Sequence, residues 1–227
     1  MTSEDIANST TSETDETKPE AMLTAIEARV LGSLLEKQMT TPDVYPLTLN
    51  SLVLACNQKT SREPVMNLQN GAVHHCLNQL EERKLVDIEY GSRADKYKQK
   101  LSKVMMFDKA EQALFCLMLL RGPQTINELL SRSHRMHVFK GAEEIEEYLT
   151  THLGKLNPLV VRIPAQAGQR EDRYTHTLCG DPDVAFTTMP SAPSTRSAVV
   201  NEEMNDLKDR VEALEKQVSW LMEQLGE

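Results

Sequence analysis

The sequence predicts a mainly helical α+β fold in which one structural plan occurs twice. Two segments, 22–104 and 105–179, each begin with a capping box and continue as an apolar helical pattern. Each then shows two more helical patterns and two short strands with alternating apolar residues. A heptad repeat after residue 199 is the third observation, and it predicts a C-terminal coiled-coil helix over residues 200–227. Three helices followed by a two-stranded hairpin is the winged-helix plan, so we expect two tandem winged-helix domains.

The first copy contains each element of this plan. Its first helix follows the capping box Thr24–Glu27, in which the threonine hydroxyl accepts a helix-start N–H and the glutamate reaches back. A second helix is expected over Leu47–Cys56 and a third over Gly71–Glu82, where apolar residues recur at helical spacing. Two strands around Ile88 and Tyr97, joined by a polar loop, would form the wing.

The second copy repeats this order. Its first helix follows the capping box Asp108–Glu111 and contains the apolar run Ala113–Leu120. A second helix is expected over Thr125–Ser131, and a third after a Lys-Gly-Ala sequence that matches the Asn-Gly-Ala of the first copy. The hairpin strands are expected at Leu159–Ile163 and Tyr174–Leu178, with a longer loop between them.

Charge is divided unevenly along the chain. Residues 1–20 carry six acidic side chains and one basic side chain, and residues 201–227 carry eight and three. The segment between them is close to neutral, so the formal net charge of −9 neither requires nor excludes a polyanionic partner. We expect residues 1–21 to be a disordered acidic extension, and residues 180–199, rich in proline, serine and threonine, to be a linker.

No pattern in the sequence indicates an enzyme, a metal centre or a cofactor. A glycine-rich phosphate loop is absent from the sequence. The four cysteines occur singly, three of them in apolar helical patterns, and we expect reduced core thiols. His134 and His137 have a spacing that one helix face can use for a metal, but no cysteine or carboxylate cluster completes such a site. Without a signal peptide or a long apolar run, we expect a soluble, cytoplasmic protein that does not enter membranes.

Two stretches of the first copy resemble the signature of the YceH-like bacterial proteins. They are Leu23–Pro42, which reads LTAIEARVLGSLLEKQMTTP, and Ala55–Leu68, which reads ACNQKTSREPVMNL, with Tyr45-Pro-Leu between them. The resemblance covers about residues 22–225. It implies two winged helices per chain and a C-terminal helix, and it implies no known activity.

The third helix of the first copy has a polar face suited to reading DNA. Asparagine and glutamine can pair with adenine edges, and histidines offer further donors. Basic residues flank this helix in the preceding loop and in the wing, where they would neutralise phosphates. The alternative is an ordinary polar helix beside a solvated hairpin. In this hairpin one acidic residue, Asp95, lies among the four basic residues. The candidate DNA contacts are His74, His75, Asn78, Gln79, Lys59, Arg62, Arg93, Lys96, Lys98 and Lys100.

The third helix of the second copy is acidic. It carries Glu143, Glu144, Glu146 and Glu147 in one short run. Phosphate would repel these carboxylates, so we expect this copy to pack against the first or against another protein. The sequence therefore predicts a non-enzymatic regulator that contacts double-stranded DNA through its first winged helix. The alternative is a scaffold whose winged helices dock an unknown protein partner.

The loop Asn57–Leu68 between the second and third helices is longer than a helix-turn-helix needs. Pro64 favours an extended conformation at the residue before it, and three apolar side chains nearby can anchor the loop, so we expect a fixed shape. Two roles remain open. The loop either presents polar and basic side chains, such as Lys59 and Arg62, to a ligand, or it closes the interface between the two copies.

Beyond the linker, apolar residues alternate at spacings of four and three. This repeat, with valine at two of the four a positions and leucine at three of the four d positions, favours a parallel two-stranded coiled coil and thus a homodimer. Glu203 with Lys208, and Arg210 with Glu215, are placed to pair between the two helices. The alternative is a helix folded back on its own domains. The expected contact residues are Val200, Met204, Leu207, Val211, Leu214, Val218, Leu221 and Leu225.

Overall fold

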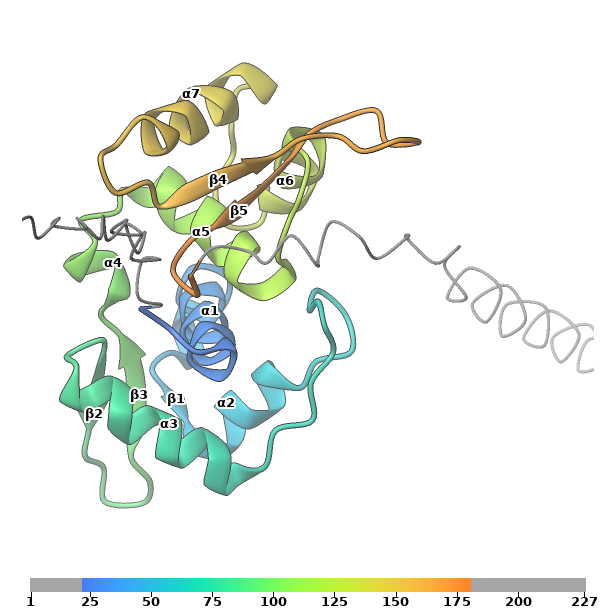
Figure 1. Ribbon diagram of the computed structural model, residues 1–227. Helices are drawn as coiled ribbons and strands as arrows, with labels where there is room; N and C mark the ends of the chain where they lie inside the picture. Colours follow the sequence, from blue (N-terminus) through green and yellow to red (C-terminus); the bar gives the residue numbers. More distant parts are fainter. Residues whose placement is uncertain (1–21, 181–227) are drawn as a thin grey trace, which may run out of the picture. The chain divides into compact units, whose positions relative to one another are not determined.

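The computed structural model describes residues 22–180, which form a mixed, mostly helical α+β fold (Figure 1). The expected acidic extension, the linker beyond residue 180 and the coiled coil lie outside the described residues. Helices, one 3-10 turn and short strands alternate in the first half of the fold. These elements are α1 (Ala25–Thr40), η1 (Pro42–Val44), β1 (Leu47–Thr48), α2 (Leu49–Cys56), α3 (Asn70–Glu82), β2 (Val86–Glu89) and β3 (Lys96–Gln99).

The second half begins with one short helix and then repeats the order of three helices and a hairpin. The predicted elements are present in the predicted order, although some ends differ, since α6 extends to Ser133 rather than Ser131. The short helix over Leu101–Val104, the turn η1 and the strand β1 were not predicted. The elements of this half are α4 (Leu101–Val104), α5 (Lys109–Arg121), α6 (Ile126–Ser133), α7 (Ala142–Leu153), β4 (Val160–Ile163) and β5 (Arg173–His176).

Both predicted capping boxes form. At the start of α1, Glu27 N donates to Thr24 Oγ1 at 3.3 Å, and Thr24 N donates to Glu27 Oε2 at 2.7 Å. Asp108 and Glu111 make the same reciprocal pair at the start of α5, each bond being 2.8 Å. Each box satisfies two backbone N–H groups that the first helical turn leaves without partners, and this fixes where the helix begins.

The first sheet has three strands in the order β1-β3-β2, all antiparallel, and not the two that the hairpin pattern predicts. The prediction of a helix from Leu47 is wrong at its start, because Leu47 and Thr48 pair with β3 as a short strand. Leu47 lies opposite Tyr97, and both side chains are buried. Thr48 then caps α2 by accepting from Ser51 N at 3.4 Å, so the helix begins two residues later.

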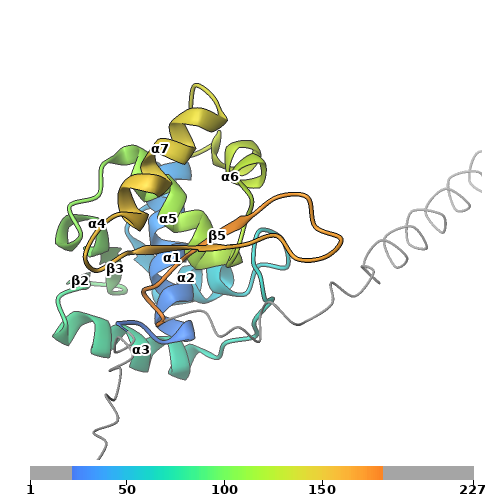
Figure 2. The same cartoon turned by 45° about the horizontal axis from the view of Figure 1, so that its top comes forward.

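Helices α1 and α5 pack closely and form the centre of the fold (Figure 2). Their close approach depends on Gly32, because a Cβ there would lie 3.0 Å from Leu120 Cγ. Cys116 Sγ of α5 lies 3.5 Å from the Gly32 carbonyl oxygen. One apolar cluster contains buried residues from both helices and from both hairpins. The two halves thus share a continuous core, which places their loops on a common framework.

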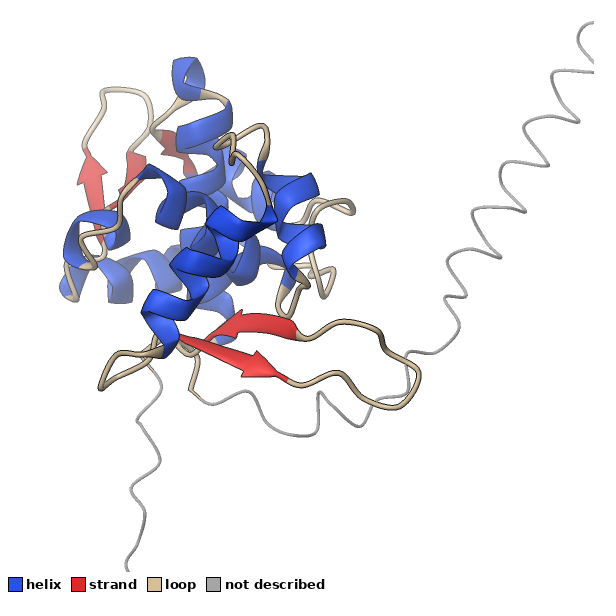
Figure 3. Ribbon diagram, turned by 90° about the horizontal axis from the view of Figure 1, so that it is seen from above, coloured by secondary structure: helices blue, strands red, loops and turns tan. Residues whose placement is uncertain are grey.

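The second hairpin, β4–β5, is antiparallel and carries a long loop that projects from the helices (Figure 3). An ion pair between Arg162 and Asp172 closes the base of this loop, with Arg162 Nε 2.6 Å from Asp172 Oδ2. Asp172 also accepts from Ala165 N at 2.8 Å. A further bridge between Gln124 and Tyr174 ties the hairpin to the segment before α6. The loop bases are thereby held on the fold.

The expected positions of the cysteines are confirmed for three of the four. Cys56, Cys76 and Cys116 are buried, whereas Cys179 is exposed, and all four are free thiols. Burial raises the pKa of Cys76 to about 12 and raises the pKa of Cys56 and Cys116 as well, which makes these thiols poor nucleophiles. Between residues 22 and 180, none of the helices is long and apolar enough to span a bilayer.

Candidate nucleic-acid interface

Helix α3 separates its side chains cleanly into two faces. Val73, Cys76, Leu77 and Leu80 are buried at spacings of three and four residues, as the sequence predicts. The intervening polar side chains consequently point outward. The structure brings four candidate contact residues onto this exposed face: His74, His75, Asn78 and Gln79.

The N-terminal end of α3 is free of acidic side chains, and its carboxylates are confined to Glu81 and Glu82 at the other end. Asn70 Nδ2 donates to Asn50 Oδ1 at 2.9 Å and so connects this end to the start of α2. The residue before the helix, Gln69, makes no capping bond through its side chain. Helix-start N–H groups and the helix dipole favour an anion, so this end can accept a phosphate.

The β2–β3 hairpin, the predicted wing, is less basic than the sequence predicts. The register of β2 and β3 places Asp87 opposite Lys98 and Glu89 opposite Lys96, next to the candidate contacts. Lys98 Nζ lies 2.7 Å from Glu89 Oε1, and Lys100 Nζ lies 3.0 Å from Asp87 Oδ1. A hydrogen bond from Lys100 lowers the pKa of the Asp87 carboxyl, so this carboxyl is ionised at neutral pH.

Two bases of the β2–β3 hairpin remain without a carboxylate partner among residues 22–180. Arg93 lies in the exposed loop between β2 and β3, and Lys96 is exposed at the start of β3. The expectation that four wing bases face a single acid is thus corrected: the facing strand supplies two further acids, and Lys98 and Lys100 are engaged by them. The alternating pattern of β2 contained both acids, but only the hairpin register shows which lysines they meet.

Arg62 is not a surface contact, and the expectation that it flanks α3 for phosphate is wrong. Its side chain is buried, with 2% of the residue exposed. The two terminal nitrogens lie 3.1 and 2.7 Å from the carboxylate oxygens of Glu36, and Nε donates to the Ala55 carbonyl at 3.0 Å. This forked ion pair engages the guanidinium inside the protein, so the group is not available to a phosphate.

The loop from Asn57 to Leu68 has the fixed shape that the sequence predicts. Asn57 Nδ2 donates to the Leu68 carbonyl at 2.8 Å, and Leu68 N donates to Asn57 Oδ1 at 2.7 Å. Buried Arg29 donates to the Pro64 carbonyl at 2.6 Å, and Glu63 N donates to the Leu120 carbonyl of α5 at 2.8 Å. These bonds favour the second of the two roles, in which the loop ties the halves together, while Lys59 stays exposed.

In the second half, α7 presents the acidic face that the sequence predicts. Glu143, Glu146 and Glu147 are exposed, and Glu144 accepts from Lys140 N at 2.6 Å. The opposite face buries Ile145, Leu149 and His152 against the core.

The structure does not bring His134 and His137 onto one helix face. Helix α6 ends at Ser133, so both histidines lie beyond it. His134 Nδ1 lies 3.1 Å from the Ser131 carbonyl oxygen, and the His137 ring lies edge-on to Phe139, with centroids 4.6 Å apart. Across the described range, no group of three or more histidine, cysteine or acidic side chains is arranged to hold a metal ion.

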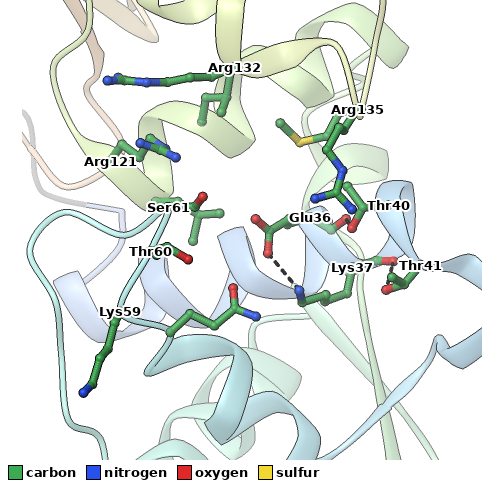
Figure 4. Close-up of a pocket in the computed structure, with 14 residues that line it drawn as sticks. Glu36, Lys37, Thr40, Thr41, Lys59, Thr60, Ser61, Arg121, Arg132 and Arg135 are labelled. Atoms are coloured by element: carbon green, nitrogen blue, oxygen red, sulfur yellow. Dashed lines mark hydrogen bonds and ion pairs between the residues drawn. The ribbon is translucent and has the colours of Figure 1, made fainter. Parts of the chain in front are cut away.

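Sequence reasoning missed a cleft of about 390 Å³ between the two halves (Figure 4). Its basic side chains come from four parts of the fold: α1, the loop after α2, α5, and the end of α6 with the residues just beyond it. The basic pair Arg132 and Arg135 was visible in the sequence, but nothing local indicated that Lys37, Lys59 and Arg121 would join it. These five bases line the cleft together with one carboxylate, that of Glu36.

Comparison with known proteins identifies relatives over nearly the whole chain. Residues 23–169 match a family model described as "Protein of unknown function, DUF480". A UPF0502 protein of Cellvibrio japonicus is 52% identical over 205 residues, covering 90% of this chain and 93% of the relative. A UPF0502 protein of Pseudomonas fluorescens strain Pf0-1 is 49% identical over 218 residues, covering 94% and 100%. A third, from Xanthomonas axonopodis pv. citri, is 44% identical over 211 residues, covering 93% and 94%.

Proposed function

The chain belongs to this bacterial family, DUF480 or UPF0502, with which the resemblance to YceH-like proteins is consistent, and we propose that it is a non-enzymatic, DNA-associated regulator. In this proposal α1, α2, α3 and the β2–β3 hairpin form a winged helix, and a second winged helix follows in tandem. The protein contacts duplex DNA through α3 and works in the cytoplasm as a dimer. The observation that carries the proposal is the exposed polar face of α3, which holds His74, His75, Asn78 and Gln79 without a carboxylate among them.

The charges around α3 support a contact with phosphate on either side of a groove. Arg93 and Lys96 are exposed on the wing and lack carboxylate partners in the described part of the chain. The uncapped start of α3 adds backbone N–H groups and the positive end of the helix dipole. Phosphate contacts would fix the orientation of the protein, and the polar face of α3 would then meet base edges.

Docking of a protein partner remains the second candidate, and one observation favours it. Half of the wing bases are engaged by Asp87 and Glu89, which lowers the net positive charge that the hairpin offers to DNA. A hairpin with alternating acids and bases is also suited to a protein surface of mixed charge. The two candidates differ in their dependence on salt, because DNA binding through phosphates weakens steeply and log-linearly as salt rises.

We expect the full chain to shift a random DNA duplex in a mobility assay at low salt and micromolar protein. Lys96→Ala should weaken binding to all sequences and lower the salt slope by about one. Asn78→Ala should instead change sequence preference with little change in the slope. Arg170→Ala removes an exposed base from the loop of the second hairpin and serves as the matched control. Absence of any shift by the unaltered protein would exclude the DNA proposal in favour of protein docking.

The dimer is proposed from the heptad repeat alone, since residues 200–227 lie outside the described range. Sedimentation equilibrium of the full chain should give a dimer, and a chain ending at Ser197 should give a monomer. The heptads Met204–Leu225 supply the buried seam of a parallel pair, whose loss removes the contact between chains. If both chains are monomers at tens of micromolar, the helix does not pair between chains and the dimer is wrong.

A further inference from the structure

The cleft between the two halves is a second site of a different chemical character from α3. It is bounded by the last turns of α1, the loop after α2, the end of α5 and the end of α6. Figure 4 shows Arg121 and Arg135 on two sides of the space next to Glu36, whereas Arg132 extends away from this space and Lys59 extends outward at its edge. A volume of about 390 Å³ lies in the range of pockets that hold small molecules.

The single acid in this cleft contributes little free negative charge. The Glu36 carboxylate accepts hydrogen bonds from both terminal nitrogens of Arg62, which lie on its buried side. It also lies 3.4 Å from Lys37 Nζ. Burial by itself would raise the pKa of this carboxyl, but the hydrogen bonds and charges of Arg62 and Lys37 outweigh it and lower the pKa. The negative charge of Glu36 is therefore balanced by Arg62 and Lys37. The other basic side chains of the cleft give it an excess of positive charge.

Arg121 and Arg135 have no carboxylate partner within residues 22–180, and only Arg132 of the three arginines is engaged. Arg132 donates to Gln124 Oε1 at 2.9 Å and lies 3.4 Å from Glu128 Oε1. Arg121 is half-buried, and burial together with the charges of Arg132 and Arg62 lowers the pKa of its guanidinium. A partly desolvated cation surrounded by like charges gains free energy when an anion enters beside it.

Hydroxyl groups in the cleft divide into engaged and available donors. Thr40 and Thr41 donate to the carbonyls of Glu36 and Lys37, at 2.8 and 3.2 Å. Within residues 22–180 the hydroxyls of Thr60 and Ser61, which lie on the loop side of the cleft, make no hydrogen bond. The available donors are thus guanidinium, ammonium and hydroxyl groups, which is the donor set that phosphate oxygens accept from.

We propose that this cleft binds a small phosphate-bearing ligand, with the guanidinium groups of Arg121 and Arg135 as its principal contacts. The planar fork of arginine matches two oxygens of one phosphate, and several arginines around one cavity favour a ligand with more than one phosphate. Leu117, Leu120 and Met136 supply the apolar part of the lining, which includes no aromatic side chain. Recognition therefore depends on the phosphate groups and not on stacking of a base. This inference does not depend on DNA binding by α3.

Inorganic pyrophosphate is the probe for a calorimetric titration of the full chain at low ionic strength. We expect saturable binding by the unaltered protein and a rise in its melting temperature at saturation. Arg121→Gln and Arg135→Gln should each weaken binding by about tenfold or more, since each removes a charge-assisted contact. Arg170→Gln, an exposed base outside the cleft, should bind as the unaltered protein does. Melting curves without ligand establish that each variant is folded.

Four results would overturn the proposal. The first is no saturable binding of pyrophosphate up to millimolar concentration, and the second is binding that the two cleft variants leave unchanged. The third is tighter binding of citrate than of pyrophosphate, which would make the cleft a carboxylate site. A mobility shift of duplex DNA that depends on Arg121 and Arg135, without pyrophosphate binding, would also overturn it and would assign the cleft to the DNA surface. Wing variants distinguish these outcomes from the test of α3.

Discussion

Replacing Arg62 with alanine is expected to lower the free energy of unfolding by about 3 to 5 kcal/mol, as for other buried ion pairs that lose one partner. The change leaves the Glu36 carboxylate, whose side chain is 15% exposed, without its forked partner. It also removes the bond from Arg62 Nε to the Ala55 carbonyl, which fixes the loop to the end of α2. Urea unfolding followed by circular dichroism measures the loss, and the largest part arises from the Glu36 carboxylate, which keeps only Lys37 beside it.

Two variants separate this mechanism from a general effect of the loop. Lys59→Ala changes an exposed base three residues away and should cost less than about 0.5 kcal/mol. Combining Arg62→Met with Glu36→Met leaves no unpaired charge, so the double variant should recover at least about half of the loss. Equal costs for Arg62→Ala and Lys59→Ala would show that the ion pair does not stabilise the fold.

Lowering the pH from 7 to 4.5 is expected to destabilise the protein by about 2 to 3 kcal/mol through His176 alone. His176 ends β5, and its Nδ1 is buried without a hydrogen-bond partner in the described chain. Burial lowers the pKa of this imidazole from 6.5 to about 4. Between these two values the unfolded chain binds a proton that the folded chain does not, so stability is complete above pH 6.5 and declines as the pH falls toward 4.

The measurement is the free energy of unfolding in urea at several pH values, compared between the unaltered protein and His176→Leu. The variant lacks this titration, so the difference between the two proteins should change by the stated amount across the interval. His75→Leu, which alters an exposed histidine on α3, should keep the full decline. If the two leucine variants show the same pH dependence, protonation of His176 does not weaken the fold.

The contacts of Arg62 and its neighbours also show what the residues of the family signature do in this chain. The stretch Ala55–Leu68 resembles the signature of the YceH-like proteins, and its side chains mostly hold the loop in place. Asn57 bonds to Leu68, Arg62 to Glu36, and the Pro64 carbonyl accepts from Arg29 of α1. A long motif of this kind can therefore report the architecture of the loop, while the neighbouring cleft and α3 carry the exposed polar groups.

Sequence alone determined the features that depend on neighbours within a few residues. The capping boxes at Thr24 and Asp108, the buried stripe of α3 with its exposed polar face, and the order of three helices and a hairpin all follow from local spacing. Each is governed by contacts between residues three or four apart on a helix, or two apart on a strand. Such contacts can be predicted directly from the order of the amino acids.

Tertiary structure decided where the charged side chains lie and which of them remain free. The sequence predicts that Arg62 is a surface base, whereas in the structure it pairs inside the protein with Glu36, 26 residues earlier. Lys98 and Lys100 read as phosphate contacts until the hairpin register sets Asp87 and Glu89 beside them. The cleft gathers bases from Lys37 to Arg135 only because α1 and α5 pack together. The interaction of a charge depends on distance and on burial, and residues far apart in the sequence set both.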